Sequence, residues 1–246
     1  MTLWFWTGTV IATAITGIAC VIRHFRTEDG CDHDQITFMI ENIMAKFIFY
    51  WMTVPRFWSY EVTWCDQETR LALMKNPGAF ILAANHSSII DTLFIALFPV
   101  RKTYTYNLKW SRVPVFGWLC LWAGYIGIDT KSEEGKKQIV PRVAERVKQG
   151  YSVMVYPEGT RNKHPPKPLL KLKTGAFRVA HAAQRPVLPL VLKNTWQGMS
   201  RYGVVDIATM KMIICKPIVP TDAKEQTFEQ IQADVERYRQ TVEETL

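Results

Sequence analysis

Residues 79–91 read Ala79-Phe80-Ile81-Leu82-Ala83-Ala84-Asn85-His86-Ser87-Ser88-Ile89-Ile90-Asp91. The first six are apolar, which is typical of a short buried strand, and the apolar run 92–98 that follows is typical of a helix. His86 and Asp91 therefore lie where a strand gives way to a helix, and a site can open at such a turn. On one continuous helix the two side chains would point about 140° apart, so they can meet only if His86 lies in the turn and Asp91 in the first helical turn.

A second interpretation of the same residues is purely structural. Ser88 and Asp91 have the spacing of a capping box, in which the carboxylate serves the N-terminus of the helix and no chemistry is implied. A histidine followed five positions later by an aspartate is a weak pattern when it stands alone. The rest of the chain must decide between the two interpretations.

Size and composition fit one domain with an appendage, because 246 residues can bury a proper core. Aromatic residues make up 12% of the chain and include nine tryptophans, which is rich for a soluble enzyme and fits a protein at a membrane interface. The five cysteines, at positions 20, 31, 65, 120 and 215, form no C-x-x-C motif, so we expect free thiols in a reducing compartment.

The positive charge is concentrated in the middle of the chain. Residues 101–185 hold 17 Lys and Arg against 5 Asp and Glu, a balance of +12, whereas residues 221–246 hold 3 against 7, a balance of −4. A basic segment favours an anionic partner such as phosphate, nucleic acid or acidic lipid headgroups. Ordinary surface lysines are the alternative explanation.

The N-terminal region reads as a two-helix membrane anchor over residues 1–55. Leu3–Ile22 is an uncharged run long enough to cross a hydrocarbon core, and the basic residues that follow it predict a cytoplasmic location for the rest of the chain. A signal peptide would carry its charges before the apolar run, and a buried soluble helix is the remaining alternative. Ile36–Trp51 has apolar residues at helical spacing and suits either a bilayer surface or a protein core.

Residues 56–246 alternate between strand-like and helix-like segments, which predicts an α/β domain with a mixed central sheet flanked by helices. Besides 79–84, the expected strands are 58–64, 103–107, 125–129, 151–156, 187–192 and 212–215. Besides 92–98, the expected helices are 114–123, 136–148, 175–183 and 228–242, with Pro141 leaving the start of the second of these open.

Two further turns carry polar groups suited to an anion. Glu158-Gly159-Thr160-Arg161 follows a strand, with a glycine that allows close approach of the backbone and an arginine whose planar fork matches phosphate. Glu158 could orient that arginine or bind a substrate hydroxyl. Lys109 and Arg112 stand just before an apolar helix, an arrangement that fits a phosphate headgroup beside an acyl chain and equally fits cations that snorkel beside a membrane.

These motifs together resemble the glycerophospholipid acyltransferase family, and within it the 1-acylglycerol-3-phosphate (lysophosphatidic acid) acyltransferases. Four blocks occur in the family's order, namely His86-x4-Asp91, Lys109…Pro114-x-x-Gly117, Glu158-Gly159-Thr160-Arg161 and Val187-Leu188-Pro189-Leu190. The likeness runs from about residue 58 to 220, and the two-helix start is also similar. The lysine stands a residue or two closer to the proline than is usual in the family, so either Lys109 or Arg112 could meet the phosphate. The fourth block lacks the glycine often found after it.

The resemblance implies a 1-acylglycerol-3-phosphate O-acyltransferase, which transfers an acyl group from a thioester on coenzyme A or acyl carrier protein to the free hydroxyl of the lysophospholipid. His86 would be the general base and Asp91 its orienting partner, while Lys109, Arg112, Glu158, Gly159, Thr160 and Arg161 would bind the substrate. Histidine has the pKa range suited to this task near neutrality, and the substrate hydroxyl would take the place of the serine in a hydrolase triad. No cofactor or metal is expected, and the catalytic domain is expected on the cytoplasmic face of a membrane.

Other classes remain as alternatives. The acceptor could be another lysophospholipid, since these motifs do not specify the headgroup. A membrane-anchored lipid hydrolase using Ser87 or Ser88 would be expected to carry a G-x-S-x-G elbow, and the sequence has none. A nucleic-acid-binding protein is disfavoured because no recognised motif is present, and a metalloenzyme because H-E-x-x-H is absent and the five histidines are scattered.

Overall fold

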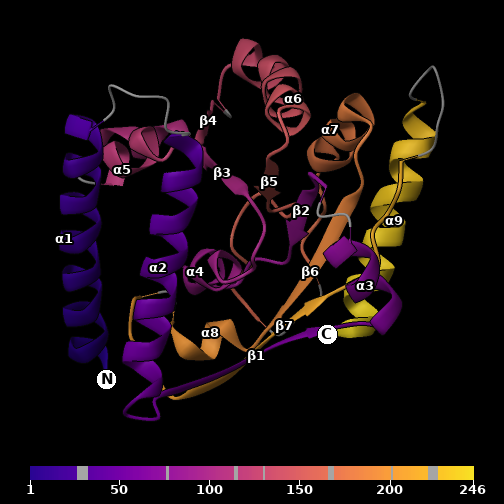
Figure 1. The fold of residues 1–246 in the computed structure, drawn as a ribbon. Helices are drawn as coiled ribbons and strands as arrows, with labels where there is room; N and C mark the ends of the chain where they lie inside the picture. The colour runs from indigo at the N-terminus through magenta and orange to yellow at the C-terminus, as the bar shows by residue number, and fades with distance from the viewer. Residues whose placement is uncertain are drawn as a thin grey trace. The chain divides into compact units, whose positions relative to one another are not determined.

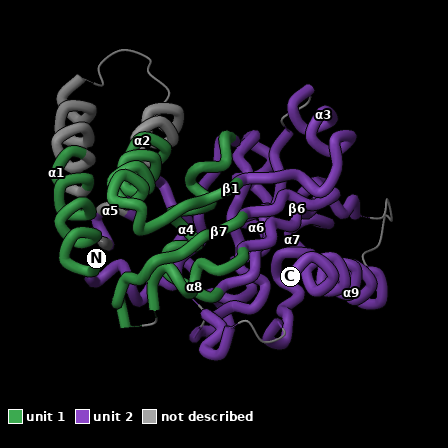
Figure 2. Tube along the Cα trace, turned by 90° about the horizontal axis from the view of Figure 1, so that it is seen from below, with its two compact units in different colours: residues 1–61, 87–99, 193–211 green, residues 62–86, 100–192, 212–246 purple. Residues whose placement is uncertain are grey.

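The computed structural model (Figure 1) describes residues 1–26, 33–75, 78–113, 116–129, 131–165, 169–200, 202–220 and 227–246. By the contacts between its residues, the chain divides into two compact units (Figure 2). Unit 1 contains residues 1–61, 87–99 and 193–211, and unit 2 contains residues 62–86, 100–192 and 212–246. The predicted anchor, residues 1–55, lies within unit 1, and its boundary near residue 55 stays a prediction.

The two N-terminal helices are present as predicted. Helix α1 (Thr2–Arg26) and helix α2 (His33–Thr53) pack side by side in unit 1 (Figure 1). The rings of Trp4 and Trp51 stack with 4.6 Å between centroids, and each indole N–H donates to the other residue's carbonyl at 3.0 Å. Gly8 permits this approach, since a Cβ there would lie 2.5 Å from the Trp51 ring.

Within the part of the chain that the structure describes, no helix combines the length and apolar character that a membrane-crossing segment requires.

The strands form one seven-stranded sheet in the order β1-β7-β6-β2-β5-β3-β4 within the described ranges. Their bounds are β1 (Trp58–Trp64), β2 (Ile81–Ala84), β3 (Lys102–Asn107), β4 (Ile126–Ile128), β5 (Ser152–Val155), β6 (Val187–Lys193) and β7 (Ala208–Ile214). Strand β2 pairs in parallel with β5 and β6, and β3 pairs in parallel with β5 and β4. An antiparallel bridge joins Val187 to Ile218. The predicted α/β class with a mixed sheet flanked by helices is confirmed.

The remaining helices show where the sequence prediction was incomplete. They are α3 (Gln67–Lys75), α4 (Ile90–Ala96), the 3₁₀ helix η1 (Leu108–Arg112), α5 (Phe116–Trp122), α6 (Glu133–Lys148), α7 (Gly175–Ala183), α8 (Thr195–Gly198) and α9 (Phe228–Thr245). The sequence did not predict α3, η1 or α8, which are short and carry no clear apolar period. Helix α6 begins three residues earlier than expected because the Ser132 hydroxyl accepts the Gly135 N–H at 3.0 Å, so Pro141 lies inside the helix.

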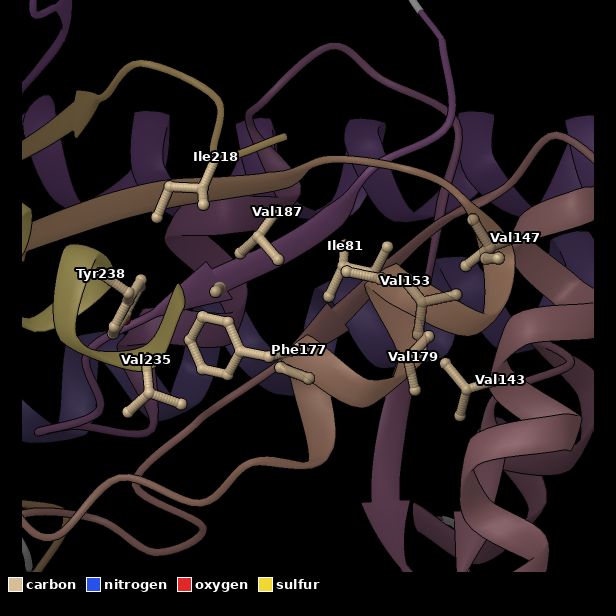
Figure 3. Close-up of a cluster of buried hydrophobic side chains, with 14 of the residues drawn as sticks. Ile81, Val143, Val147, Val153, Phe177, Val179, Val187, Ile218, Val235 and Tyr238 are labelled. Carbon is tan, nitrogen blue, oxygen red and sulfur yellow. The ribbon is translucent and has the colours of Figure 1, made fainter. Parts of the chain in front are cut away.

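The core of unit 2 forms where α6, α7 and α9 cover one face of its strands (Figure 3). Central strands of a sheet with both faces covered read as continuous apolar runs, which is why β2 and β6 were detectable. The ring of Phe177 on α7 meets the ring of Tyr238 on α9 edge to face, with 5.7 Å between centroids. The cluster includes Ile81, Val143, Val147, Val153, Val179, Val187, Ile218 and Val235 (Figure 3).

Candidate active site

His86 lies in unit 2, two residues beyond the end of the fully buried strand β2. The preceding residue fixes the start of the turn. The Asn85 amide nitrogen donates to the Leu192 carbonyl, and its amide oxygen accepts the Leu192 N–H, both at 2.8 Å. The chain is thus held to β6 at the point where it leaves the sheet, and His86 follows half-buried.

Both backbone polar groups of His86 are bound by the turn 158–162. One carboxylate oxygen of Glu158 accepts the His86 N–H at 2.8 Å, and the Asn162 N–H donates to the His86 carbonyl at 2.7 Å. The other Glu158 oxygen accepts the Leu170 N–H at 3.0 Å, and the side chain is buried. Two turns 72 residues apart in sequence are therefore neighbours. Glu158 joins backbone segments, a role that differs from the two predicted for it.

The imidazole of His86 stacks on the ring of Tyr156, with 3.8 Å between centroids and 15° between planes. Stacking at this separation holds the imidazole plane in one orientation. Sequence reasoning did not single out Tyr156 or Asn162. A signal for the tyrosine existed, because it is the last residue before the Pro157 turn and ends a strand that was predicted.

The Glu158–Arg161 turn exposes its remaining groups. Gly159 has a positive φ of +67°, and its N–H donates to the Tyr156 carbonyl at 2.9 Å. A residue with a side chain would be strained there, and its Cβ would lie 2.5 Å from the Lys173 ammonium. Thr160 and Arg161 are exposed, so the guanidinium of Arg161 is accessible to an anion from solvent.

Asp91 lies in unit 1 and is fully buried. One of its carboxylate oxygens accepts the N–H of Ser87 at 2.7 Å and the N–H of Ser88 at 2.8 Å, just before α4 begins. The structural interpretation of Asp91 as a carboxylate at a helix N-terminus therefore holds, and it does not exclude a second role. Because His86 belongs to the other unit, the pairing of His86 with Asp91 stays a prediction.

The two serines of this turn are engaged in unit 1. The Ser88 hydroxyl is buried and donates to the Met199 carbonyl at 3.0 Å, and the Ser87 hydroxyl lies 3.0 Å from that of Thr195. A serine whose proton is committed to a carbonyl lacks the adjacent base that activates a nucleophile. This arrangement gives no support to a hydrolase based on Ser88.

The second block lies on η1 and α5. The Asn107 side chain accepts the Lys109 N–H at 3.0 Å and so caps η1, while Lys109 and Arg112 both extend into solvent. Gly117 cannot be replaced without a shift, because a Cβ there would lie 2.1 Å from the Ser111 carbonyl oxygen. This close packing explains the glycine in the predicted block, whose Pro114 lies outside the described residues.

Topology brings the three blocks of unit 2 to one edge of the sheet. Strands β2, β5 and β3 are consecutive and parallel, and they end at Ala84, Val155 and Asn107. His86, Glu158 and Lys109 follow these ends by two or three residues. The carboxyl ends of parallel strands meet at the same edge, which is where open α/β sheets bind their ligands.

Burial raises the pKa of two cysteine thiols in unit 2. The pKa of Cys120 and that of Cys215 are each raised to about 11, so both thiols are protonated near neutral pH. Among the described residues, no group of His, Cys, Asp and Glu is placed to hold a metal ion. The groups that the structure brings to the candidate site are an imidazole, exposed cations and backbone N–H and carbonyl groups.

Known proteins similar to this chain are acyltransferases. Residues 62–193 match the acyltransferase family. The chain is 30% identical over 177 residues to the 1-acyl-sn-glycerol-3-phosphate acyltransferase of Saccharomyces cerevisiae, an alignment that covers 71% of this chain and 57% of the yeast protein. It is 29% identical over 161 residues to the protein of the same name from Salmonella typhimurium, covering 64% of this chain and 62% of that one.

Similarity to a solved structure extends over nearly the whole chain. The crystal structure of the 1-acyl-sn-glycerophosphate (LPA) acyltransferase from Thermotoga maritima matches with a TM-score of 0.74 at 20% identity, covering 99% of this chain and 94% of that chain. The chain spans about half the length of the curated relatives that head the comparison, at 57%, 42% and 46%. By the match across residues 62–193, the chain belongs to the acyltransferase family that includes the 1-acyl-sn-glycerol-3-phosphate acyltransferases.

Proposed function

We propose that this protein transfers a fatty acyl group from a thioester on coenzyme A or acyl carrier protein to the free hydroxyl of 1-acylglycerol-3-phosphate, giving phosphatidic acid. The observation that carries the proposal is the turn-to-turn contact in unit 2. The Glu158 carboxylate and the Asn162 N–H hold the backbone of His86 beside the turn that bears Arg161. A proton acceptor and an anion-binding guanidinium on adjoining turns are what an attack by a phosphate-bearing alcohol requires.

In the proposed mechanism, His86 takes the proton of the acceptor hydroxyl as that oxygen attacks the thioester carbonyl. A carbon–oxygen bond forms and the carbon–sulfur bond breaks, and the leaving sulfur takes the proton back from the imidazolium, so the carrier departs as a thiol and His86 is again neutral. The stacked Tyr156 ring keeps the imidazole plane fixed during proton transfer. Asp91 is the partner we assign to the imidazolium, where it would fix the tautomer and favour the charged ring.

Phosphate recognition is assigned to exposed cations at the carboxyl edge of the sheet. Arg161 supplies a planar fork for two phosphate oxygens, and Lys109 or Arg112 supplies a second charge from the end of β3. Gly159 and Thr160 would let the phosphate approach the backbone of the turn. Holding the phosphate there positions the acceptor hydroxyl against His86, which converts binding energy into orientation.

We also propose that α1 and α2 anchor the protein to the cytoplasmic face of a bilayer. Several large apolar side chains of both helices are exposed, including Leu3 at 82%, Val10 at 67% and Tyr50 at 67%. Helices that lie in the interface bury such a face among headgroups and acyl chains without spanning the membrane. The acceptor is itself a lipid, so anchoring places the site where the substrate resides.

A product assay tests the acceptor. The purified protein is given a pool of lysophospholipids, with and without a terminal phosphomonoester, together with acyl coenzyme A or acyl carrier protein, and the products are identified by mass spectrometry. We expect phosphatidic acid as the main product. Preferential acylation of a lysolipid without the phosphomonoester would reject the proposed acceptor, and release of free fatty acid without any acceptor would favour the hydrolase.

Kinetics of Arg161 variants test the phosphate contact. Arg161→Ala should raise the KM for the lysophospholipid about tenfold or more, Arg161→Lys should restore part of the loss, and the KM for the thioester should stay unchanged. Lys163→Ala removes an exposed cation two residues away and is the matched control. Equal effects of Arg161→Ala and Lys163→Ala would remove Arg161 from the binding site.

A further inference from the structure

Helices η1 and α5 of unit 2, together with Val113 directly after η1, carry exposed apolar side chains that the proposed chemistry does not use. Their exposed fractions are 61% for Leu121, 55% for Trp118, 46% for Trp110, 45% for Leu108 and 39% for Val113. We call these five side chains the Trp110 surface. A soluble monomer rarely leaves such a set of large apolar groups together on adjoining elements, so the surface calls for a partner.

Charge identifies the chemistry of that partner. Between residues 108 and 122 the sequence contains Lys109 and Arg112 and no acidic residue. The Lys109 ammonium lies 5.1 Å from the centroid of the Trp110 ring, so a cation and an indole share one exposed position. Tryptophan and leucine beside lysine and arginine form the composition that settles at the boundary between headgroups and acyl chains of an anionic bilayer.

Other exposed apolar side chains of unit 2 differ in their surroundings. Met74 on α3 is 63% exposed and Phe228 on α9 is 69% exposed. Helix α9 carries Glu229 in its first turn and further acidic residues along its length, and α3 carries Glu68 beside Arg70 and Lys75. Anionic headgroups would repel α9, whereas they would attract η1 and α5, which carry cations and no acidic residue.

The position of the Trp110 surface links it to the candidate site. Helix η1 follows β3 at the carboxyl edge of the sheet, where Arg161 follows the adjacent strand β5 and His86 follows β2 on the far side of β5. Gly117 packs α5 against the backbone of Ser111, which fastens α5 to η1.

We infer that the Trp110 surface inserts into the interfacial layer of a bilayer that contains anionic lipid, as a lipid-contacting surface of unit 2 in addition to the proposed α1–α2 anchor. The inference rests on the proposed function in that it explains how a lipid acceptor reaches this edge.

Vesicle binding of the full chain tests the inference. The double variant Trp118→Ser/Leu121→Ser removes the two most exposed members of the surface, and Met74→Ser/Phe228→Ser is the matched control with a similar loss of exposed apolar area. Partition is measured by flotation with vesicles of phosphatidylcholine and phosphatidylglycerol, after thermal unfolding shows that both variants are folded. We expect the test variant to partition about tenfold less strongly and the control to match the wild type.

A second measurement covers the case in which α1 and α2 dominate partition. Brominated lipids quench tryptophans that reach the acyl chains, so Trp118→Phe should lower the quenched fraction of the fluorescence, whereas Trp64→Phe on strand β1 should not. Equal partition of the test and control variants, together with an unchanged quenched fraction in Trp118→Phe, would overturn the inference. Neither measurement uses a substrate, so the binding results remain valid even if the acyltransferase proposal fails. Likewise, a negative binding result would not count against the proposed acyl transfer.

Discussion

Two histidines of unit 2 occupy opposite kinds of environment. His86 is half-buried in a turn at the carboxyl edge of the sheet, with its backbone bound by the turn 158–162 and its ring stacked on Tyr156. His181 lies inside the core with its side chain 1% exposed, and its Nε2 lies 2.7 Å from a carboxylate oxygen of the buried Asp234. The half-buried His86 ring can be reached by a substrate, whereas the His181 ring is enclosed by the core.

The difference shows that a histidine beside a carboxylate does not by itself make a site. The His181–Asp234 hydrogen bond joins α7 to α9. The same two helices contribute Phe177 and Tyr238 to the hydrophobic cluster (Figure 3). It satisfies two buried polar groups and contributes to the stability of the core. The His86 turn instead leaves its ring at an edge where strand ends converge. Access, together with the neighbouring cations, separates the candidate base from the structural residue.

His86→Ala should produce the largest effect on activity and the smallest on folding. The loss of a general base lowers kcat by about a hundredfold or more. The unfolding midpoint should stay near that of the wild type, because the backbone groups of His86 that bind Glu158 and Asn162 remain. Rates from single turnover and a thermal melt of the same preparation check both expectations. Activity within tenfold of the wild type would remove His86 from the mechanism.

Glu158→Gln should lower both activity and stability, since the carboxylate serves the turn of His86. An amide offers one acceptor oxygen, so either the His86 N–H or the Leu170 N–H loses its partner, and a buried unsatisfied donor costs about 1–3 kcal/mol of unfolding free energy. Displacement of the turn should reduce kcat between about tenfold and a hundredfold. Denaturant unfolding and steady-state kinetics measure the two effects, and Glu145→Gln, an exposed exchange on α6, is the control. A change confined to the KM of the acceptor would favour direct substrate binding by Glu158.

Tyr156→Leu should have a more moderate effect. The variant keeps an apolar side chain but removes the ring that stacks on the imidazole, so kcat should fall about three- to tenfold, the scale of an aromatic stacking interaction. Tyr156→Phe keeps the ring and should retain most of the activity. If both variants lose activity equally, the phenol hydroxyl matters and the stacked ring does not.

The sequence predicted the sheet, the helices that cover it and the order of the blocks, because buried strands and amphipathic helices leave a local apolar pattern. It did not predict the role of Glu158, since the two N–H groups that its carboxylate accepts lie 72 residues before it and 12 residues after it. His181 was likewise unremarkable within the predicted helix 175–183, because its partner is 53 residues away. Short helices such as α3 were not predicted, although Asp66, whose side chain accepts the Thr69 N–H, marks the start of α3. Contacts that depend on tertiary folding carry no local pattern.

Asp234→Ala should have the opposite effect to His86→Ala. The unfolding free energy should fall, and the kcat should stay unchanged. Removing the carboxylate leaves the buried His181 nitrogen without its partner, which costs about 1–3 kcal/mol of unfolding free energy. The kcat of the folded fraction should be unchanged, because the pair is buried between α7 and α9 and neither residue belongs to the candidate site. Glu236→Ala, an exposed exchange on the same helix, should change stability by less than about 0.5 kcal/mol. A kcat that falls in Asp234→Ala at full occupancy of the folded state would mean that the two histidine environments are coupled.

Alkaline pH should destabilise the core of unit 2, because two of its buried side chains are weak acids with a raised pKa. Burial raises the pKa of the Cys215 thiol to about 11. Burial, followed by the charges of Glu158 and Cys215, raises the pKa of Tyr238 well above its usual value. Acids with a raised pKa favour the folded state while they are neutral, so their contribution is complete below the unfolded pKa and is lost as pH rises through the folded pKa. The unfolding free energy should therefore decline as pH rises from about 9 toward 11.

The variants Cys215→Ala and Tyr238→Phe identify the source of this alkaline decline. Each should flatten the fall in stability, as measured by denaturant unfolding at a series of pH values. At neutral pH Tyr238→Phe should be nearly neutral, because the Tyr238 hydroxyl has no hydrogen-bond partner among the residues that the structure describes and its removal leaves no polar group unsatisfied. An unchanged alkaline slope in both variants would place the titrating groups outside this core.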